Sequence, residues 1–200
     1  MSDKVKIDHL SYSSISRYLK CPAMFKAYIT EKKPLPTEIQ LNGRARHAKI
    51  EQYLNLGNIE DSGLGGRLKN FYYRILDPVT AVEVEFKLDY ITFDIVGRID
   101  AYAVHGKQAV IVDFKGYPGD YIDELQLQIY ALAVKAKHPE VELIHAAFAY
   151  ISPDFYEMKT YFEDDLVRLS AIVSEAIDKI AVDEKYEATP GPHCTRCDYV

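Results

Sequence analysis

The spacing of apolar residues predicts helices in the first part of the chain. Clustered serines can cap a short helix over "LSYSSISRYLKCP", which we expect to end at Cys21-Pro22. A second helix over "GRARHAKIEQYLNLG" opens at Asn42 or earlier, and Gly57 supplies its stop. One face of this helix carries His47, Ile50, Glu51 and Leu54.

Two further features precede the strands. The stretch from Gly57 to Gly66 is predicted as a flexible loop. The segment "RLKNFYYRIL" then predicts an amphipathic helix with basic residues beside aromatic ones, and Pro78 follows it.

From Val79 the pattern alternates between apolar and polar residues, which is typical of strands. The segments "VTAVEVEFKLDY", "TFDIVGRIDAYAV" and "QAVIVDF", with "HGK" as a turn, predict an antiparallel meander. A long helix starts at "PGD" and runs through "YIDELQLQIYALAVKAKH"; strands follow near "ELIHAAFAYI" and "FYEMKTYF". A final helix from about Asp164 to Ile180 precedes the tail "TPGPHCTRCDYV". The expected fold is α/β of the α+β type: a central mixed sheet, containing the meander, flanked by helices.

The stretch "VDFKG" places an acid and a base at the end of an apolar strand. In an extended strand Asp113 and Lys115 share one face, opposite to Val112 and Phe114. A two-residue loop of His105 and Gly106 in the preceding hairpin would set Asp100 opposite Ile111, on the face of Asp113. A four-residue loop gives the same parity, whereas a three-residue loop puts Asp100 on the other face.

Two converging carboxylates beside a lysine suit a hard divalent ion. Mg²⁺ takes oxygen ligands and often only one or two protein carboxylates, because waters and a substrate phosphate complete its shell. Asp100 and Asp113 fit that role, and Lys115 can stabilise developing negative charge. The alternative is a rim ion pair between Asp113 and Lys115, worth about 0–1 kcal/mol.

Composition narrows the possible partners. The 200 residues are 48% apolar, enough for one globular domain with a core, so residues 1–200 are expected to form a single domain. A net charge of −6 provides no global basic footprint for nucleic acid, so a polyanion would have to meet a local patch. The candidates for that patch are Arg17, Lys20, Arg44, Arg46, Arg67, Lys69 and Arg74.

Targeting signals and cysteines bound the cellular setting. No apolar run approaches the length of a membrane span, and "MSDKVKIDHL" lacks the apolar run of a secretory signal, which favours a soluble, intracellular, cytoplasmic protein. Cys21, Cys194 and Cys197 are too few and too uneven for a disulfide framework. They are structural thiols or metal ligands.

Five short motifs occur together in a characteristic order. "GRARH", "VGRIDAY", "IVDFKG" and "QLQIY" resemble the RecB-like nucleases of the PD-(D/E)xK superfamily. "SYSSISRYLKCP" with the terminal "CTRC" resembles the CRISPR-associated exonuclease branch of that family. The resemblance covers nearly the whole chain and implies a restriction-endonuclease-like core. It further implies a Mg²⁺- or Mn²⁺-dependent deoxyribonuclease, acting as an exonuclease on DNA ends or single strands.

The resemblance also assigns roles to residues. His47, Asp100, Asp113 and the carbonyl of Phe114 would be metal ligands, and Lys115 would be the catalytic lysine. Gln126 and Tyr130, one helical turn apart, would orient the site and contact nucleic acid. Ile99 stands where the superfamily usually has a proline.

The cysteines match three of four ligands of an iron–sulfur cluster in that branch. Cys21, Cys194 and Cys197 would hold a 4Fe–4S cluster in a small appendage, but the chain ends at Val200 without the fourth cysteine. His193 as a substitute ligand would make zinc a competitor, and three ordinary thiols are the third possibility.

A different class of function also accommodates the sequence. A nuclease fold can serve as a catalytically silent nucleic-acid-binding or assembly subunit, because a fold does not fix a function. The acidic net charge favours action within a complex, with partner proteins or as a homo-oligomer. Against a silent subunit, both acids, the lysine and the histidine are present.

Overall fold

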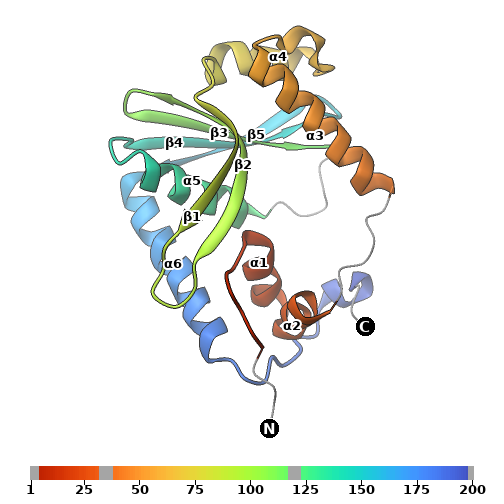
Figure 1. Cartoon of the computed structure of the whole chain (residues 1–200), viewed down its shortest axis with the longest axis vertical. Helices are drawn as coiled ribbons and strands as arrows, with labels where there is room; N and C mark the ends of the chain where they lie inside the picture. The colour runs from red at the N-terminus through yellow and green to blue at the C-terminus, as the bar shows by residue number, and fades with distance from the viewer. Residues whose placement is uncertain (1–4, 32–37, 117–122, 198–200) are drawn as a thin grey trace.

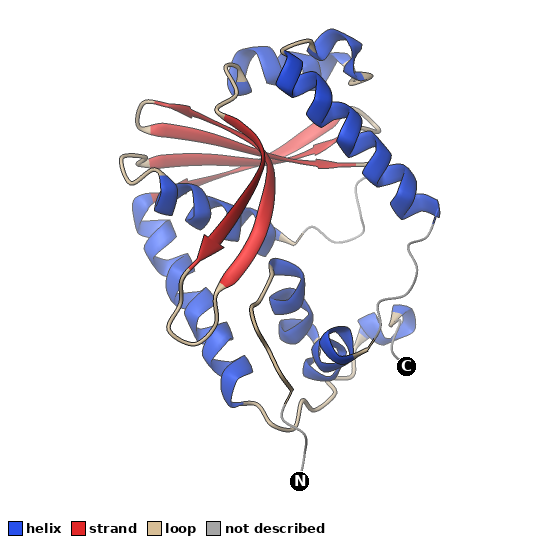
Figure 2. Ribbon diagram, viewed as in Figure 1, coloured by secondary structure: helices blue, strands red, loops and turns tan. Residues whose placement is uncertain are grey.

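A computed structural model describes residues 5–31, 38–116 and 123–197. Over these residues, five strands form one mixed sheet in the order β1-β2-β3-β4-β5. The strands are β1 (Ala81–Leu88), β2 (Ile95–His105), β3 (Gln108–Lys115), β4 (Leu143–Tyr150) and β5 (Phe155–Phe162). All neighbours are antiparallel except β3 and β4. The predicted mixed sheet with a meander flanked by helices is therefore confirmed (Figures 1 and 2).

Helices cover both faces of the sheet (Figure 2). The longer ones are α1 (Tyr12–Lys20), α2 (Pro22–Thr30), α3 (Glu38–Leu56), α4 (Gly66–Phe71), α5 (Glu124–Lys137) and α6 (Glu163–Val182). Short turns are η1 (Ile59–Ser62), the π-helical η2 (Tyr72–Leu76) and η3 (Pro192–Arg196). None of these described helices has both the length and the apolar character needed to cross a bilayer.

The first helix begins and ends where the sequence predicts. Ser11 caps α1: its side chain accepts from the Ser14 N–H, and the Ser14 hydroxyl oxygen accepts from the Ser11 N–H. Pro22 does end α1, but it also occupies the first turn of an unpredicted α2, where its missing N–H costs nothing.

The segment predicted as a flexible loop is instead packed. Its residues form η1, and the side chains of Ile59 and Leu64 are buried. The prediction was wrong because two isolated apolar residues carry no periodic signal, although together they fill the space beneath α3.

Later elements agree with the sequence patterns. Asp123 is the N-cap of α5, while the "PGD" start predicted for this helix lies outside the described residues. Helix α6 buries every apolar residue predicted for its core face, namely Leu166, Leu169, Val173, Ile177 and Ile180.

Each face of the sheet has its own apolar core. One core joins the sheet to α1, α5 and α6 through Ile15, Ile111, Ile129 and Ile177 among others. The other joins it to α3, η1 and α4 through Ile50, Ile59, Leu68 and Val112 among others. Consequently β3 is buried on both faces, and Asp113 lies within it.

The hairpin loop between β2 and β3 sets the register of Asp100. Gly106 and Lys107 form the loop and His105 pairs with Gln108, so the predicted loop of His105 and Gly106 is wrong by one residue. Gly106 takes the left-handed conformation that this turn needs, with φ 62°. The predicted parity is nevertheless confirmed, because two residues remain in the loop.

The sheet divides at this point. Pairing of β2 with β3 ends at Ala101 and Val112, and one more step of the same register would set Asp100 opposite Asp113. Beyond it, β1 and β2 stay paired with each other as far as Leu88 and Ile95. They leave the sheet as a curved two-stranded ribbon, whereas β3 continues beside β4 (Figure 1). We call the point where β2 parts from β3 the fork.

Gly97 in β2 lets an aromatic ring cross the ribbon. Phe86 pairs with Gly97, and a Cβ added to Gly97 would lie 2.6 Å from Phe86 Cζ. The Phe86 ring in turn meets the Tyr130 ring of α5 edge-on, with centroids 5.8 Å apart. The absent side chain at Gly97 therefore allows the ribbon to rest on α5.

We expect Gly97→Ala to lower the free energy of unfolding by about 1–3 kcal/mol, the usual cost of overpacking. The added methyl group would push Phe86 off Tyr130. Gly43→Ala is the matched control, because nothing lies within 4 Å of a Cβ there and alanine favours a helix. Urea unfolding measures both. A Gly97→Ala protein as stable as the wild type would show that the Phe86 ring moves freely.

Candidate active site

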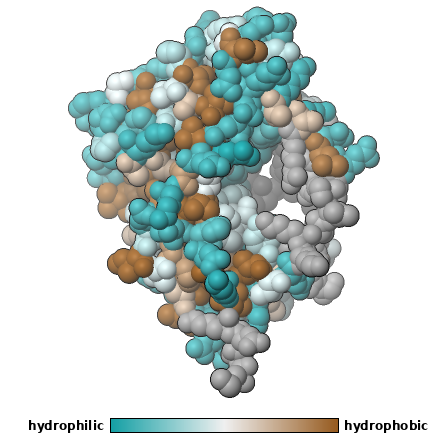
Figure 3. All heavy atoms as spheres, viewed as in Figure 1, coloured by the Kyte–Doolittle hydropathy of each residue, from teal (hydrophilic) through white to brown (hydrophobic). Residues whose placement is uncertain are grey.

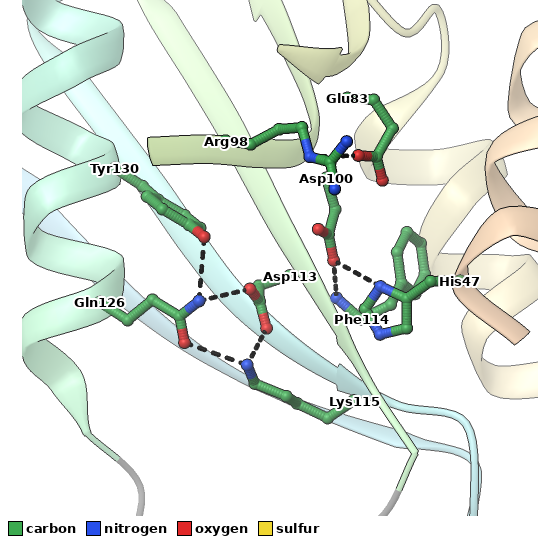
Figure 4. Close-up of polar contacts among 9 residues, drawn as sticks. All are labelled: His47, Glu83, Arg98, Asp100, Asp113, Phe114, Lys115, Gln126 and Tyr130. Atoms are coloured by element: carbon green, nitrogen blue, oxygen red, sulfur yellow. Dashed lines mark hydrogen bonds and ion pairs between the residues drawn. The ribbon is translucent and has the colours of Figure 1, made fainter. Parts of the chain in front are cut away.

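The fork is held by the carboxylate of Asp100. The main-chain N–H of Phe114 has no partner from β2 and donates to Asp100 Oδ2 at 2.7 Å. The same oxygen lies 3.4 Å from Nδ1 of His47, which α3 brings from the other face of the sheet. Asp100 thus joins β2, β3 and α3 at one point (Figure 4).

A second cluster surrounds Asp113 on the α5 side of the fork. Gln126 Nε2 donates to Asp113 Oδ1 at 2.8 Å and to the hydroxyl of Tyr130 at 2.9 Å. Lys115 Nζ donates to Gln126 Oε1 at 3.0 Å and lies 2.6 Å from Asp113 Oδ2. The sequence-predicted Asp113, Lys115, Gln126 and Tyr130 therefore form one connected network (Figure 4).

Burial makes both carboxylates poor acids. Burial, then the neighbouring Asp113 charge, raises the pKa of Asp100 to about 8, although the Phe114 N–H opposes the shift. Burial also raises the pKa of Asp113, against the opposing charge of Lys115. Burial raises the pKa of the Tyr130 hydroxyl as well, so it stays protonated. A further positive charge between the carboxylates would relieve this electrostatic cost.

Glu83 is a site residue that sequence reasoning missed. In the β1–β2 register it stands opposite Asp100, between the pairs Val82–Ala101 and Val84–Ile99. Its φ of 51° is left-handed, which is strained for a residue other than glycine, and its Oε2 lies 2.8 Å from Arg98 Nε. Burial raises its pKa despite Arg98. The alternation in "VEVEF" predicts only a strand residue at Glu83, because the residue opposite it depends on the register between β1 and β2.

The donors suit a divalent ion held by few protein ligands. Asp113 Oδ2 is buried and accepts no hydrogen bond of regular geometry, although Lys115 Nζ lies close to it. Across the described residues, no three His, Cys, Asp or Glu side chains are grouped as a complete metal site. His47 contacts Asp100, and Asp113 lies on the adjacent strand, but these three side chains do not enclose an ion by themselves. An ion bound by two carboxylates would complete its shell with water and phosphate.

The cysteines lie at the opposite end of the molecule from β3. Cys21 is buried between α1 and α2, and its Sγ accepts from the Thr189 N–H at 3.4 Å. Cys194 Sγ accepts from the Gly191 N–H at 3.4 Å, and η3 lies beside α2 (Figure 1). All three cysteines are free thiols. Cys21 thus contacts the tail at Thr189, and the described residues contain no grouped set of metal ligands, so the metal-binding appendage stays a prediction.

The predicted positive surface is divided. Arg17 lies on α1, whereas Arg67 and Lys69 lie on α4, and Figure 1 places these helices on opposite sides of the sheet. Lys69 also pairs with Glu60 at 3.0 Å. Arg17 therefore lies apart from Arg67 and Lys69, because the fold places α1 and α4 on opposite faces of the sheet.

Comparisons with known proteins agree with this architecture. The family model described as the PD-(D/E)XK nuclease superfamily matches residues 67–200. A candidate exonuclease from Eubacterium rectale superposes with a TM-score of 0.57 at 11% identity, covering 96% of this chain and 89% of its own. The protein SSO0001 superposes with a TM-score of 0.53 at 14% identity, covering 96% and 84%. No curated protein sequence matches the chain significantly. At these identities the two structures show a shared fold.

We expect the metal-free protein to lose stability as the pH rises from about 4 to about 8. The pKa of Asp100 is near 8 when folded and about 4 when unfolded, so the folded state binds more protons in that window. Asp100→Asn keeps an oxygen acceptor for the Phe114 N–H and should remove the part of this loss that Asp100 causes, leaving the part due to the raised pKa of Asp113 and Glu83. Thermal unfolding in chelator from pH 4 to pH 9 measures it.

The control for this measurement is Asp8→Asn, at an exposed aspartate remote from the fork. It should retain the wild-type pH profile. An Asp100→Asn variant with that same profile would show that the Asp100 carboxyl is an ordinary acid.

Proposed function

The chain belongs to the PD-(D/E)XK nuclease superfamily, and we propose that it is a Mg²⁺- or Mn²⁺-dependent deoxyribonuclease that acts as an exonuclease on DNA ends or single strands. One observation carries the proposal: the buried carboxylate of Asp113, the partly buried carboxylate of Asp100 and a lysine meet at the fork, where Gln126 and Tyr130 hold Asp113 and Lys115. The printed name of the Eubacterium rectale relative supports the exonuclease assignment.

Asp100 and Asp113 would hold the metal ion, with the Phe114 carbonyl and His47 as further ligands. When bound, one or two such ions supply Lewis-acid activation of water and neutralise charge on the phosphate. Both carboxyls retain protons more strongly than ordinary aspartates, so they would release them on binding a cation. Glu83, opposite Asp100, adds negative potential to the same place.

Lys115 is the residue that would act on the phosphate. With Asp113 bound to a cation, the ammonium keeps its hydrogen bond to Gln126 Oε1 and can turn its other protons to the attacking water or a phosphate oxygen. The ring of Phe148, 5.3 Å from Nζ, covers it on one side. Lys115 is therefore positioned before the substrate arrives.

Gln126 and Tyr130 would act as positioning residues. Both protons of the Gln126 amide are used, one by Asp113 and one by the Tyr130 hydroxyl, so its oxygen must face Lys115. Tyr130 in turn is fixed against Phe86. This arrangement orients Lys115 through contacts that do not involve the reacting atoms.

The cysteines support a second metal centre as a finer part of the proposal. Two thiol sulfurs accept main-chain N–H groups, as iron–sulfur ligands do, and Nε2 of His193 is buried without a partner. We favour a 4Fe–4S cluster on Cys21, Cys194 and Cys197. Zinc with His193 is the alternative. Either metal centre would require Cys194 and Cys197 to move closer to Cys21 than they are in this structure.

We expect Asp113→Ala and Lys115→Ala each to lower the cleavage rate by about 100-fold or more. Their metal affinities should differ. Asp113→Ala loses a ligand and should bind Mn²⁺ more weakly, whereas Lys115→Ala should bind it as tightly or more tightly, because the ammonium no longer occupies Asp113 Oδ2. Cleavage of end-labelled single- and double-stranded DNA and Mn²⁺ calorimetry test both points.

Lys107→Ala, at an exposed lysine of the hairpin loop, is the control and should cleave normally. Wild-type cleavage rates in both site variants would remove Asp113 and Lys115 from the chemistry. A folded wild-type protein that binds DNA yet never cleaves it with Mn²⁺ would favour the silent subunit.

The cysteine proposal has its own test. Anaerobically purified protein should be brown and contain iron and acid-labile sulfide in comparable amounts, and Cys21→Ser should lose both. Zinc without iron would select the His193 alternative. Colourless protein with neither metal would leave the three cysteines as structural thiols.

A further inference from the structure

A pocket of about 360 Å³ opens beside Lys115, between α1 and the ribbon. Its lining includes Tyr12, Ser13, Phe86, Arg98, Lys115 and Tyr130. A wider hollow of about 600 Å³ shares Phe86 and Arg98 with it and continues along the ribbon to Lys87. Figure 3 shows this side of the molecule hollowed between α3 and α1.

We propose that this pocket holds one unpaired nucleotide of the DNA strand, the one joined to the scissile phosphate, with its base stacked on Phe86. This proposal rests on the proposed nuclease function. The nucleotide is placed in this pocket because the pocket adjoins the active site: Lys115 and Gln126 line the pocket and also belong to the network around Asp113. A phosphate beside Lys115 therefore carries one of its two sugars to the pocket mouth.

The wall chemistry matches a nucleobase. Phe86, Tyr130 and Tyr12 supply aromatic surface, on which any base can stack without regard to sequence. The Phe86 ring rests on the backbone of Gly97 and against the Tyr130 ring, so it cannot fold away. It remains partly exposed, at the wall of the pocket.

Charge on the rim suits the strand that follows. Arg98 is 62% exposed, and its Nε is held by Glu83 at 2.8 Å, so its terminal N–H groups can meet a phosphate. Glu83 thereby fixes the arginine between the pocket and Asp100. The strand would leave the site along the hollow beside the ribbon.

The volume selects an unpaired nucleotide. About 360 Å³ is at the lower end of the range for pockets that enclose small molecules, so one nucleoside fits and a base pair does not. A duplex would therefore have to give up its last pair before cleavage. The shape of the pocket alone would therefore explain the proposed preference of the enzyme for DNA ends and single strands.

The test uses single-stranded oligonucleotides in which one abasic nucleotide is moved through each position near both ends. With wild-type protein, one position should lower affinity in chelator and single-turnover cleavage with Mn²⁺ by roughly tenfold, as expected for one lost stacking contact. Phe86→Leu should bind and cleave the intact strand about as poorly, and the abasic nucleotide should then make less than about a twofold difference.

Phe93→Leu is the matched control, since Phe93 belongs to the same hairpin, packs on the core and lies outside the pocket lining. It should keep the wild-type sensitivity to the abasic position. If wild-type protein cleaves every abasic strand like the intact one, the pocket proposal fails and the nuclease stands. If Phe86→Leu slows cleavage but keeps the abasic effect, Phe86 only supports Tyr130 and the stacking proposal fails.

The binding measurement separates the two proposals. Position-dependent loss of affinity without any cleavage would support the pocket and overturn the nuclease. Absence of DNA binding by folded protein would overturn both.

Discussion

The carboxylate of Asp100 takes the place of a strand. Where β2 leaves β3, the Phe114 N–H would be left without a partner in a buried position, and a buried unpaired N–H is costly. The Asp100 side chain meets that need from the end of the departing strand. An acceptor at this position therefore stabilises the fork, and Lys115 is half-exposed in the opening between β2 and α5, beside the buried Asp113.

The same constraint explains the electrostatics of the site. The Asp100 carboxylate lies at the fork between the apolar cores on the two faces of the sheet, so water solvates its charge poorly. Asp113 lies next to it in the same surroundings, and burial disfavours its charge as well. Lys115 pairs with Asp113, and Arg98 pairs with Glu83. Among the described residues, Asp100 has no cation beside it other than His47, and it retains its proton up to a pKa of about 8. In the proposed function a divalent cation would take the place of that proton, and phosphate could then bind to the cation.

Sequence patterns predicted those parts of the site that depend on local geometry. Strand alternation placed Asp113 and Lys115 on one face. The resemblance to the nuclease family singled out Gln126 and Tyr130, and helical spacing places them one turn apart. Parity placed Asp100 correctly even though the loop was misplaced by one residue, because only an odd loop length changes the face. Glu83 escaped prediction because its position opposite Asp100 depends on the register of β1, which no turn residue specifies. Helix α2 escaped prediction because the missing N–H of Pro22 both ends α1 and is tolerated at the first position of α2, and the sequence-based prediction rests on its helix-ending effect alone.

Gly97 links the packing of the β1–β2 ribbon to the active site, a role that its place in the motif "VGRIDAY" does not reveal. It stands in β2 three residues before Asp100, and its missing side chain serves Phe86 rather than the carboxylate. Phe86 holds Tyr130, Tyr130 fixes the amide of Gln126, and Gln126 directs Lys115. A contact on the ribbon is thereby transmitted to the ammonium through three side chains, those of Phe86, Tyr130 and Gln126. Because the pocket lies along this same chain of contacts, whatever fills it also bears on the group that orients the lysine.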